Sequence, residues 1–217
     1  MKHVLNQFFD KIYCITCENF TDRHSLVKEQ LKDIEFDWVI SPPSASLFNN
    51  GHITTSEMSV ALGQISVINN ARLNGYNKIA IWEDDGVLTA TSNEIKSFID
   101  EIPDKWDFLY LGNANWTDKF WPPIVKEYSL HVNKVYRANG CSFIGINSQI
   151  YNEILFKLNK LDRASDFKFN DLYERGNTYG PKKYFSNTIS IPHEKIRHTF
   201  SEENLKKFIP SYISHTL

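Results

Sequence analysis

The stretch NKIAIWEDDGVL, residues 77–88, places three consecutive carboxylates, Glu83, Asp84 and Asp85, directly after an apolar run. The run itself, residues 79–82, is β-branched, small or aromatic, which predicts a buried strand. Because side chains alternate along a strand, Glu83 and Asp85 are expected on one side and Asp84 on the other. Two carboxylates about 5 Å apart repel by roughly 3 kcal/mol at an effective dielectric near 20, and a divalent cation between them would turn this repulsion into attraction.

Two interpretations of the acidic stretch are open. The first is a solvated turn that reverses at Gly86, since acidic loops are common. The second is a site for a hard, oxygen-seeking metal ion such as Mg²⁺ or Mn²⁺. The position of the carboxylates favours the second interpretation, because ligand sites in α/β proteins concentrate at the carboxyl ends of strands.

Strands and helices alternate outward from this stretch. Strands are expected at residues 11–16, 36–40, 79–82, 107–112 and 141–147. Helices are expected at residues 22–34, 54–75, 93–102 and 148–161. Thr54 and Glu57 have the S/T-x-x-E spacing of a capping box, which explains Glu57 better than a direct role as a ligand. The alternation predicts an α/β fold with a largely parallel central sheet flanked by helices.

Composition narrows the class of protein. The 217 residues carry a net charge of -2 and are 41% hydrophobic, which is typical of a globular protein and gives no electrostatic footprint for nucleic acid. No Pro/Ser/Gly-rich linker divides the chain, so we expect a single domain over residues 1–217. No secretory h-region and no run of 18 apolar residues occur, so no transmembrane segment and a cytoplasmic location are expected. Peripheral contact with a membrane is the alternative, for which residues 202–213 are the candidate segment.

The cysteines do not indicate a disulfide framework. Cys14 and Cys17 form a CxxC, but a zinc site needs four ligands and there is no second CxxC. We therefore expect both to be core or strand-end residues.

The sequence LNGYNKIAIWEDDGVL, residues 73–88, resembles the central motif of the family 25 glycosyltransferases, the lipooligosaccharide and procollagen sugar transferases. Three further stretches resemble the family in order and spacing: KIYCITCENFTDR at 11–23, TTSEMSVALGQISVINNA at 54–71 and WDFLYLG at 106–112. The resemblance covers about residues 10–160. The chain departs from the family pattern at Gly63 and Gln64, where the family usually has Ser-His.

The resemblance implies a GT-A fold, in which an Asp-x-Asp-like motif and Mn²⁺ or Mg²⁺ hold the diphosphate of a UDP-sugar donor. In this chain Asp85 would be the first choice as metal ligand, together with Glu83. Asp84 would complete the motif on the donor side. Asn19 and Arg23 follow the first strand, where they would contact the nucleotide; for Arg23, a surface position at a helix N-terminus is the alternative.

The late part of the chain offers the remaining groups. Inverting transfer needs a base for the acceptor hydroxyl, and the resemblance favours Asp166, with Asp171 second. Either could instead be a helix cap or a surface charge. His193, which follows an expected strand at 187–191, is the preferred histidine ligand of the metal, with a surface or capping histidine as the alternative.

The expected function is metal-dependent transfer of galactose or glucose from a UDP-sugar to a hydroxyl of a glycan, lipooligosaccharide or hydroxylysine acceptor, with inversion. The alternative is a degenerate relative that binds a nucleotide or glycan without turnover, motivated by Gly63 and Gln64. A glycoside hydrolase fits less well, because consecutive acids on one strand do not flank a glycosidic bond as two carboxyl groups roughly 5 to 9.5 Å apart would.

Overall fold

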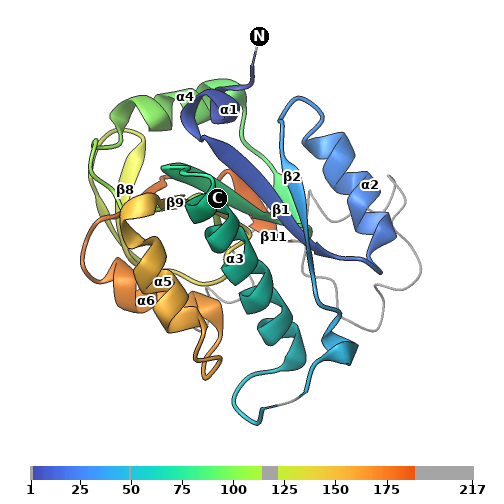
Figure 1. Cartoon of the computed structure of the whole chain (residues 1–217). Helices are drawn as coiled ribbons and strands as arrows, with labels where there is room; N and C mark the ends of the chain where they lie inside the picture. The colour runs from blue at the N-terminus through green and yellow to red at the C-terminus, as the bar shows by residue number, and fades with distance from the viewer. Residues whose placement is uncertain (1, 49, 114–121, 189–217) are drawn as a thin grey trace.

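The computed structural model describes residues 2–48, 50–113 and 122–188, which form helices around a central sheet (Figure 1). The sheet has eight strands in the order β2-β1-β3-β9-β5-β10-β8-β7. Their bounds are β1 Lys11–Cys17, β2 Asp37–Ser41, β3 Lys78–Glu83, β5 Phe108–Tyr110, β7 Ile124–Glu127, β8 Val132–Arg137, β9 Phe143–Asn147 and β10 Thr178–Pro181. A second sheet, in the order β4-β11-β6, joins β4 Gly86–Leu88, β11 Ser186–Thr188 and β6 Gly112–Asn113.

Most strands of the large sheet share one direction. β1, β2, β3, β5, β7 and β10 run one way, whereas β8 and β9 run the opposite way. Most strands therefore share one direction, but the sheet is not the largely parallel one predicted, because four of its seven neighbouring strand pairs are antiparallel. Its pairing is mixed, because β9 lies between β3 and β5 and is antiparallel to both.

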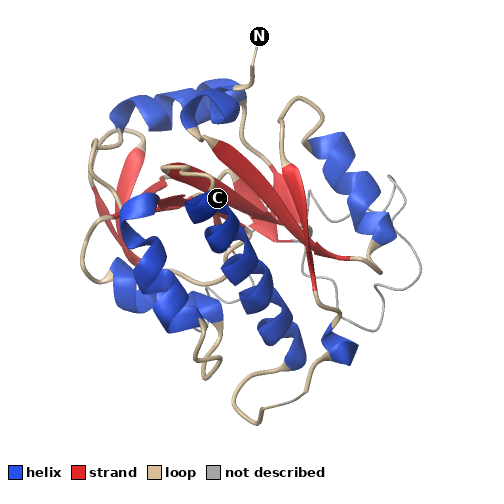
Figure 2. Cartoon of the chain, viewed as in Figure 1, coloured by secondary structure: helices blue, strands red, loops and turns tan. Residues whose placement is uncertain are grey.

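Helices cover both faces of this sheet (Figure 2). They are α1 Val4–Phe8, α2 Thr21–Gln30, α3 Thr55–Leu73, α4 Ser92–Glu101, α5 Tyr151–Leu158 and α6 Ser165–Tyr173, with 3₁₀ turns at Ser44–Ser46 and Ser148–Ile150. Buried side chains of α3, α5 and α6 form one apolar cluster with the sheet. Those of α1, α2 and α4 form another on the opposite face. None of the helices within the described ranges is long and apolar enough to cross a membrane.

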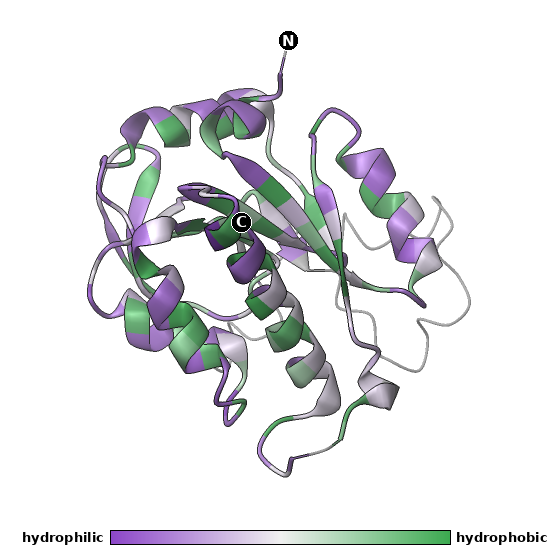
Figure 3. Cartoon of the chain, in the orientation of Figure 1, coloured by the Kyte–Doolittle hydropathy of each residue, from purple (hydrophilic) through white to green (hydrophobic). Residues whose placement is uncertain are grey.

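Burial on both faces explains the apolar run before the acidic stretch. In β3, Ile79 and Ile81 contribute to the cluster under α3, whereas Ala80 and Trp82 contribute to the cluster under α2 and α4. A strand covered on both faces is apolar continuously rather than in alternation. Figure 3 shows hydrophobic colour along much of the central strands, whereas the helices carry both hydrophobic and hydrophilic colour.

The structure can be compared with the local elements expected from the sequence. The capping box is present at the start of α3, where Thr54 Oγ1 accepts a hydrogen bond from Glu57 N at 3.2 Å and Glu57 Oε2 accepts one from Thr54 N at 2.7 Å. The expected strand at 107–112 is divided: after β5, Leu111 N donates to Phe143 O, and the chain continues into β6 of the second sheet. Elements α1, β4, β7, β8, α6 and β10 were not predicted.

The cysteines are free and lie where expected. Cys14 is buried in the core of β1, and Cys17 ends that strand, 3.5 Å from Ser41 Oγ.

The connection between β7 and β8 is tied to the end of α4. Glu101 accepts hydrogen bonds from the Ser129 hydroxyl at 2.5 Å and from the His131 backbone N–H at 2.9 Å. The His131 ring lies 2.5 Å from the same carboxylate. These hydrogen bonds, that of Ser129 first, lower the pKa of Glu101 to about 2.

Candidate functional site

The carboxyl ends of β1, β2 and β3 meet at one edge of the sheet. The parallel register places Ile15 opposite Glu83 and Ser41 opposite Cys17. This pairing brings the start of α2 beside the three carboxylates. The edge is the position at which ligands bind in open α/β sheets.

Backbone hydrogen bonds hold the acidic turn, residues 83–86, on both sides. Glu83 ends β3, and its N–H donates to Ser142 O at 3.0 Å. The N–H of Asp84 donates to Ile15 O at 3.2 Å. The turn is therefore fixed by β1 on one side and by the segment before β9 on the other.

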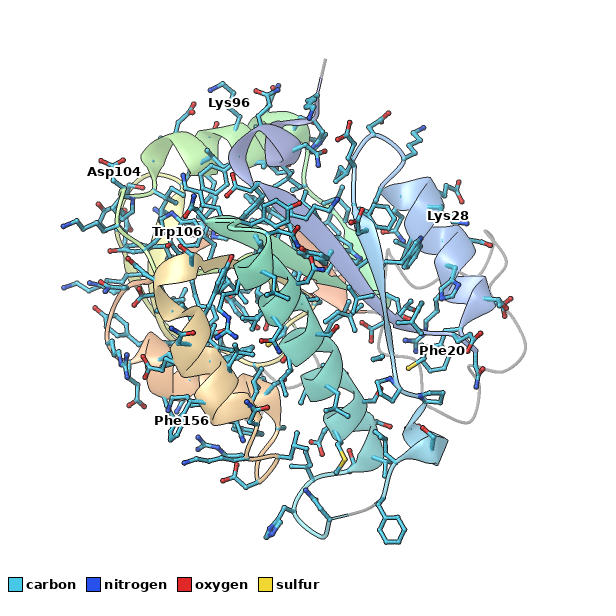
Figure 4. All side chains as sticks on the ribbon, in the orientation of Figure 1. Phe20, Lys28, Lys96, Asp104, Trp106 and Phe156 are labelled. Atoms are coloured by element: carbon cyan, nitrogen blue, oxygen red, sulfur yellow. The ribbon has the colours of Figure 1, made fainter. Side chains whose placement is uncertain are left out.

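Asp84 uses both of its carboxylate oxygens within the protein. Its Oδ1 accepts a hydrogen bond from Arg23 Nη1 at 2.7 Å, and its Oδ2 accepts one from the Thr16 hydroxyl at 2.5 Å. The side chains of Asp84 and Arg23 are 8% and 16% exposed, so the ion pair is largely shielded from water. The Arg23 guanidinium also lies 4.5 Å from the centre of the Phe20 ring, labelled in Figure 4. Two residues predicted to contact the donor thus bind each other.

Asp85 differs from Asp84. Its Oδ1 is buried and accepts no hydrogen bond from any residue within the described ranges. Burial raises the pKa of Asp85 to about 6; the Arg23 guanidinium opposes this rise, and the charge of Asp84 adds to it. Unlike Asp84, Asp85 therefore has a carboxylate oxygen that no group of the described protein engages.

Glu83 completes the acidic turn. Burial raises its pKa well above the ordinary range, and the charges of Asp85 and Asp166 raise it further. Among the described residues, no set of three or more His, Cys, Asp and Glu side chains is arranged as a complete metal site. Mg²⁺ is commonly held by one or two carboxylates together with substrate phosphates, and Asp85 and Glu83 are the residues of the turn that would supply such carboxylates.

Asp166 comes to the acidic turn from a distant part of the chain. It lies in the first turn of α6, where its carboxylate accepts hydrogen bonds from Phe167 N at 2.8 Å and Gly140 N at 3.3 Å. Burial raises its pKa. One turn later Asn170 binds the backbone N–H and C=O of Ala138 at 2.8 and 2.9 Å, which fixes α6 to this segment. The structure thus brings Asp166 within electrostatic range of Glu83.

The other predicted residues are less closely connected. Asn19 is exposed in the turn between β1 and α2. Asp171 is 41% exposed and forms ion pairs with Arg163 Nη2 at 2.5 Å and Lys157 Nζ at 3.3 Å, which gives it partners on the outer side of α6. His193 lies outside the described residues, as does the segment 202–213, and their roles stay predictions.

A packing reason accounts for Gly63. A Cβ added at this position would lie 2.8 Å from Ile15 Cγ2 and 3.2 Å from Ser41 Cβ, because α3 lies close against β1 and β2. A serine, the usual residue of the family, would not fit without movement. The next residue, Gln64, is fully buried, and neither its Oε1 nor its Nε2 has a hydrogen-bond partner in the described part of the chain.

Sequence reasoning did not identify Thr16 and His24. Thr16 Oγ1 contacts both Asp84 Oδ2 and His24 Nε2. The alternation along β1 places Thr16 on the face of Cys14, but its proximity to the acidic turn follows only from the pairing of β1 with β3.

No family model matches the chain, and no curated protein matches it. A solved structure described as a glycosyltransferase involved in the glycosylation of the major capsid of PBCV-1 has a TM-score of 0.52 and 12% identity, over 86% of this chain and 96% of that chain. A putative nucleotide-diphospho-sugar transferase from Desulfovibrio desulfuricans G20 has a TM-score of 0.46 and 8% identity, over 90% and 93% of the two chains. At 12% identity the likeness to the first of these structures is one of fold, and it confirms the predicted GT-A-like α/β architecture.

Proposed function

We propose that the chain is a metal-dependent glycosyltransferase of the family 25 kind. It moves a sugar, galactose or glucose, from a UDP-sugar to a hydroxyl of a glycan, lipooligosaccharide or hydroxylysine acceptor, with inversion. The observation that carries the proposal is Asp85, whose buried Oδ1 lacks a hydrogen-bond partner among the described residues at the carboxyl edge of the sheet. The fold shared with the PBCV-1 glycosyltransferase supports it.

In this proposal Asp85 and Glu83 hold Mn²⁺ or Mg²⁺, and His193 adds a ligand from beyond the described residues. The cation supplies positive charge that stabilises the departing diphosphate. Asn19, Arg23 and Asp84 belong to the donor side. Arg23 also limits the repulsion within the acidic turn, because its charge opposes the rise in the pKa of Asp85.

Asp166 is the proposed base that accepts the proton of the acceptor hydroxyl. Its pKa is raised by burial, which brings a carboxylate nearer to the range in which general bases work at neutral pH. Asp171 is the second choice, and its ion pairs with Arg163 and Lys157 favour a structural role.

The first test is a calorimetric titration of the protein with UDP, in Mn²⁺ and again in EDTA. We expect binding that requires Mn²⁺ and that Asp85→Asn abolishes. The matched control is Asp104→Asn, an exposed carboxylate in the connection before β5 (Figure 4), which should leave binding unchanged. Equal affinity in Mn²⁺ and EDTA would refute the metal role, and no binding in either would refute a UDP donor.

The same protein samples distinguish an enzyme from a non-catalytic relative. Mn²⁺-dependent UDP binding, followed by transfer from UDP-galactose or UDP-glucose to a saccharide acceptor, would establish the activity. Binding without transfer to any glycan, lipooligosaccharide or hydroxylysine acceptor would identify the degenerate relative instead.

A further inference from the structure

Hydrogen bonds connect α2 to the acidic turn in two ways, directly through Arg23 and indirectly through Thr16. His24 Nε2 lies 2.9 Å from Thr16 Oγ1 and 3.2 Å from Cys17 O. Thr16 Oγ1 lies 2.5 Å from Asp84 Oδ2 and 3.3 Å from Cys17 O. From the other side, Arg23 Nη1 reaches Asp84 Oδ1 at 2.7 Å. Both Arg23 and His24 belong to α2, so this helix holds Asp84 through two consecutive residues.

The acceptors determine the direction of each hydrogen bond. An ionised carboxylate only accepts, so the single hydroxyl proton of Thr16 is directed to Asp84, its nearer acceptor. The oxygen of Thr16 can then accept from His24, and Cys17 O also only accepts. His24 therefore carries its hydrogen on Nε2. The short contact of Thr16 with Asp84 is in the range of charge-assisted O–H···O⁻ bonds.

The His24 ring is also held from its other side. It packs against Trp38 of β2 with the ring centres 5.0 Å apart. The position of the donor is thus set by β2 as well as by α2. A donor with a fixed ring orientates the groups to which it is hydrogen-bonded.

These contacts give Asp84 and Asp85 different roles. Asp84 has both oxygens engaged within the protein, and its backbone N–H is bound to Ile15 O. Asp85 follows directly and has a buried oxygen without a partner among the described residues. Fixing Asp84 at three points limits the backbone of the turn and so the direction of the Asp85 side chain.

We infer that Thr16 and His24 are positioning residues, which hold the acidic turn through Asp84 so that Asp85 presents its carboxylate to the cation. Asp84 is the anchor of the turn in this arrangement, because both of its oxygens are engaged within the protein. The inference rests on the proposed function, because it assigns the metal to Asp85.

The test compares variants of Thr16 by titration with Mn²⁺ in saturating UDP. Thr16→Val keeps the shape and removes the hydroxyl, and we expect it to weaken Mn²⁺ binding by about 10- to 100-fold, as loss of a group that orients a metal ligand does. Thr16→Ser restores the hydroxyl and should restore most of the affinity. His24→Gln should bind Mn²⁺ more tightly than His24→Leu, because a glutamine amide keeps an N–H donor near the position of Nε2.

The matched control is Tyr13→Phe. Tyr13 lies on β1, as Thr16 does, but on the face covered by α3. The substitution removes the 2.7 Å hydrogen bond from Tyr13 Oη to Asn70 Oδ1 of α3. Its thermal unfolding reports the purely structural cost of losing a side-chain hydrogen bond of β1, and its Mn²⁺ affinity should equal that of the wild type.

The outcomes separate the inference from the proposed function. If wild-type protein binds Mn²⁺ with UDP and Thr16→Val does so equally well, the positioning role is wrong and the function stands. If Thr16→Val and Thr16→Ser lose affinity equally, the hydroxyl is not responsible and the inference also fails. If wild-type protein shows no Mn²⁺-dependent binding, the function is wrong and the positioning role falls with it.

Discussion

Gly63→Ala should destabilise the protein, although alanine is the better helix former. The substitution lies inside α3, where replacing glycine by alanine normally stabilises by about 1 kcal/mol. Here the new Cβ would lie 2.8 Å from Ile15 Cγ2 and 3.2 Å from Ser41 Cβ. Favourable carbon contacts begin at about 3.5 Å, so α3 or β1 must move.

The size of the effect follows from two opposing quantities. Overpacking a core commonly costs about 1–3 kcal/mol. Ile15 is 4% exposed and its Cγ2 is attached directly to Cβ, so it yields little, and the cost should lie in the upper part of that range. After subtraction of the gain in helix propensity, Gly63→Ala should lower the free energy of unfolding by about 1–2 kcal/mol. For a chain of this size this corresponds to a fall in Tm of roughly 2–8 °C.

Urea unfolding of four proteins provides the assay: wild type, Gly63→Ala, Ile15→Leu and the double variant. Leucine has nearly the volume of isoleucine but no Cγ2, so it removes the closest obstacle. In the Ile15→Leu background, Gly63→Ala should therefore be less destabilising by at least about 1 kcal/mol, a coupling typical of residues in contact. A higher free energy of unfolding for Gly63→Ala alone would refute the close packing, and additive effects would refute Ile15 as its cause.

Three further predictions concern charged groups. A double-mutant cycle of Arg23→Met and Asp84→Asn, measured by urea unfolding, should give a coupling of about 2–4 kcal/mol, because the pair is nearly buried; a coupling below about 0.5 kcal/mol, as at exposed pairs, would contradict this. Asp166→Asn should reduce sugar transfer by about 10²-fold and leave UDP binding unchanged, whereas Asp171→Asn should change transfer only a few-fold; the reverse result would move the base to Asp171. Glu101→Gln should lower Tm at pH 7. Folding lowers the pKa of Glu101 from 4.5 to about 2, so the ionised carboxylate stabilises the folded protein fully above pH 4.5. This stabilisation is lost as the pH falls toward 2. The difference in Tm from the wild type should shrink over that interval, and a difference independent of pH would contradict the assignment.

Elements with a strong local signal were predictable from the sequence. The apolar run at 79–82 and the capping box at Thr54 and Glu57 predicted β3 and the start of α3, and both are present. These signals depend on residues close together in the chain. They need no knowledge of the tertiary structure.

Helix α6 shows why other elements were missed. Its buried face includes Lys168 and Asn170, so hydrophobic periodicity does not reveal it. Lys168 is buried because its Nζ donates to Lys157 O at 2.6 Å and forms an ion pair with Asp162 at 2.6 Å. Both polar residues are satisfied by partners that the sequence pattern does not indicate.

The candidate site also has a part that could be predicted from the sequence and a part that depends on tertiary contacts. The three carboxylates are adjacent in sequence and could be recognised directly. The engagement of Asp84 by Arg23 and Thr16 depends on the pairing of β1 with β3, and the approach of Asp166 depends on the packing of α6. Neither contact could be read from spacing.

The position of β9 has a consequence for the order of events during synthesis. β3 is complete early, but one of its neighbours, β9, comes much later: Ile81 pairs with Ile144. Contacts so distant in sequence form slowly, and an emerging chain exposes the unpaired edge of β3 until β9 is made. The acidic turn gains Ser142 only with β9 and Asp166 only with α6. A nascent chain that ends before β9 therefore carries all three carboxylates of the turn and an open strand edge, which makes it a client for chaperones before its site is assembled.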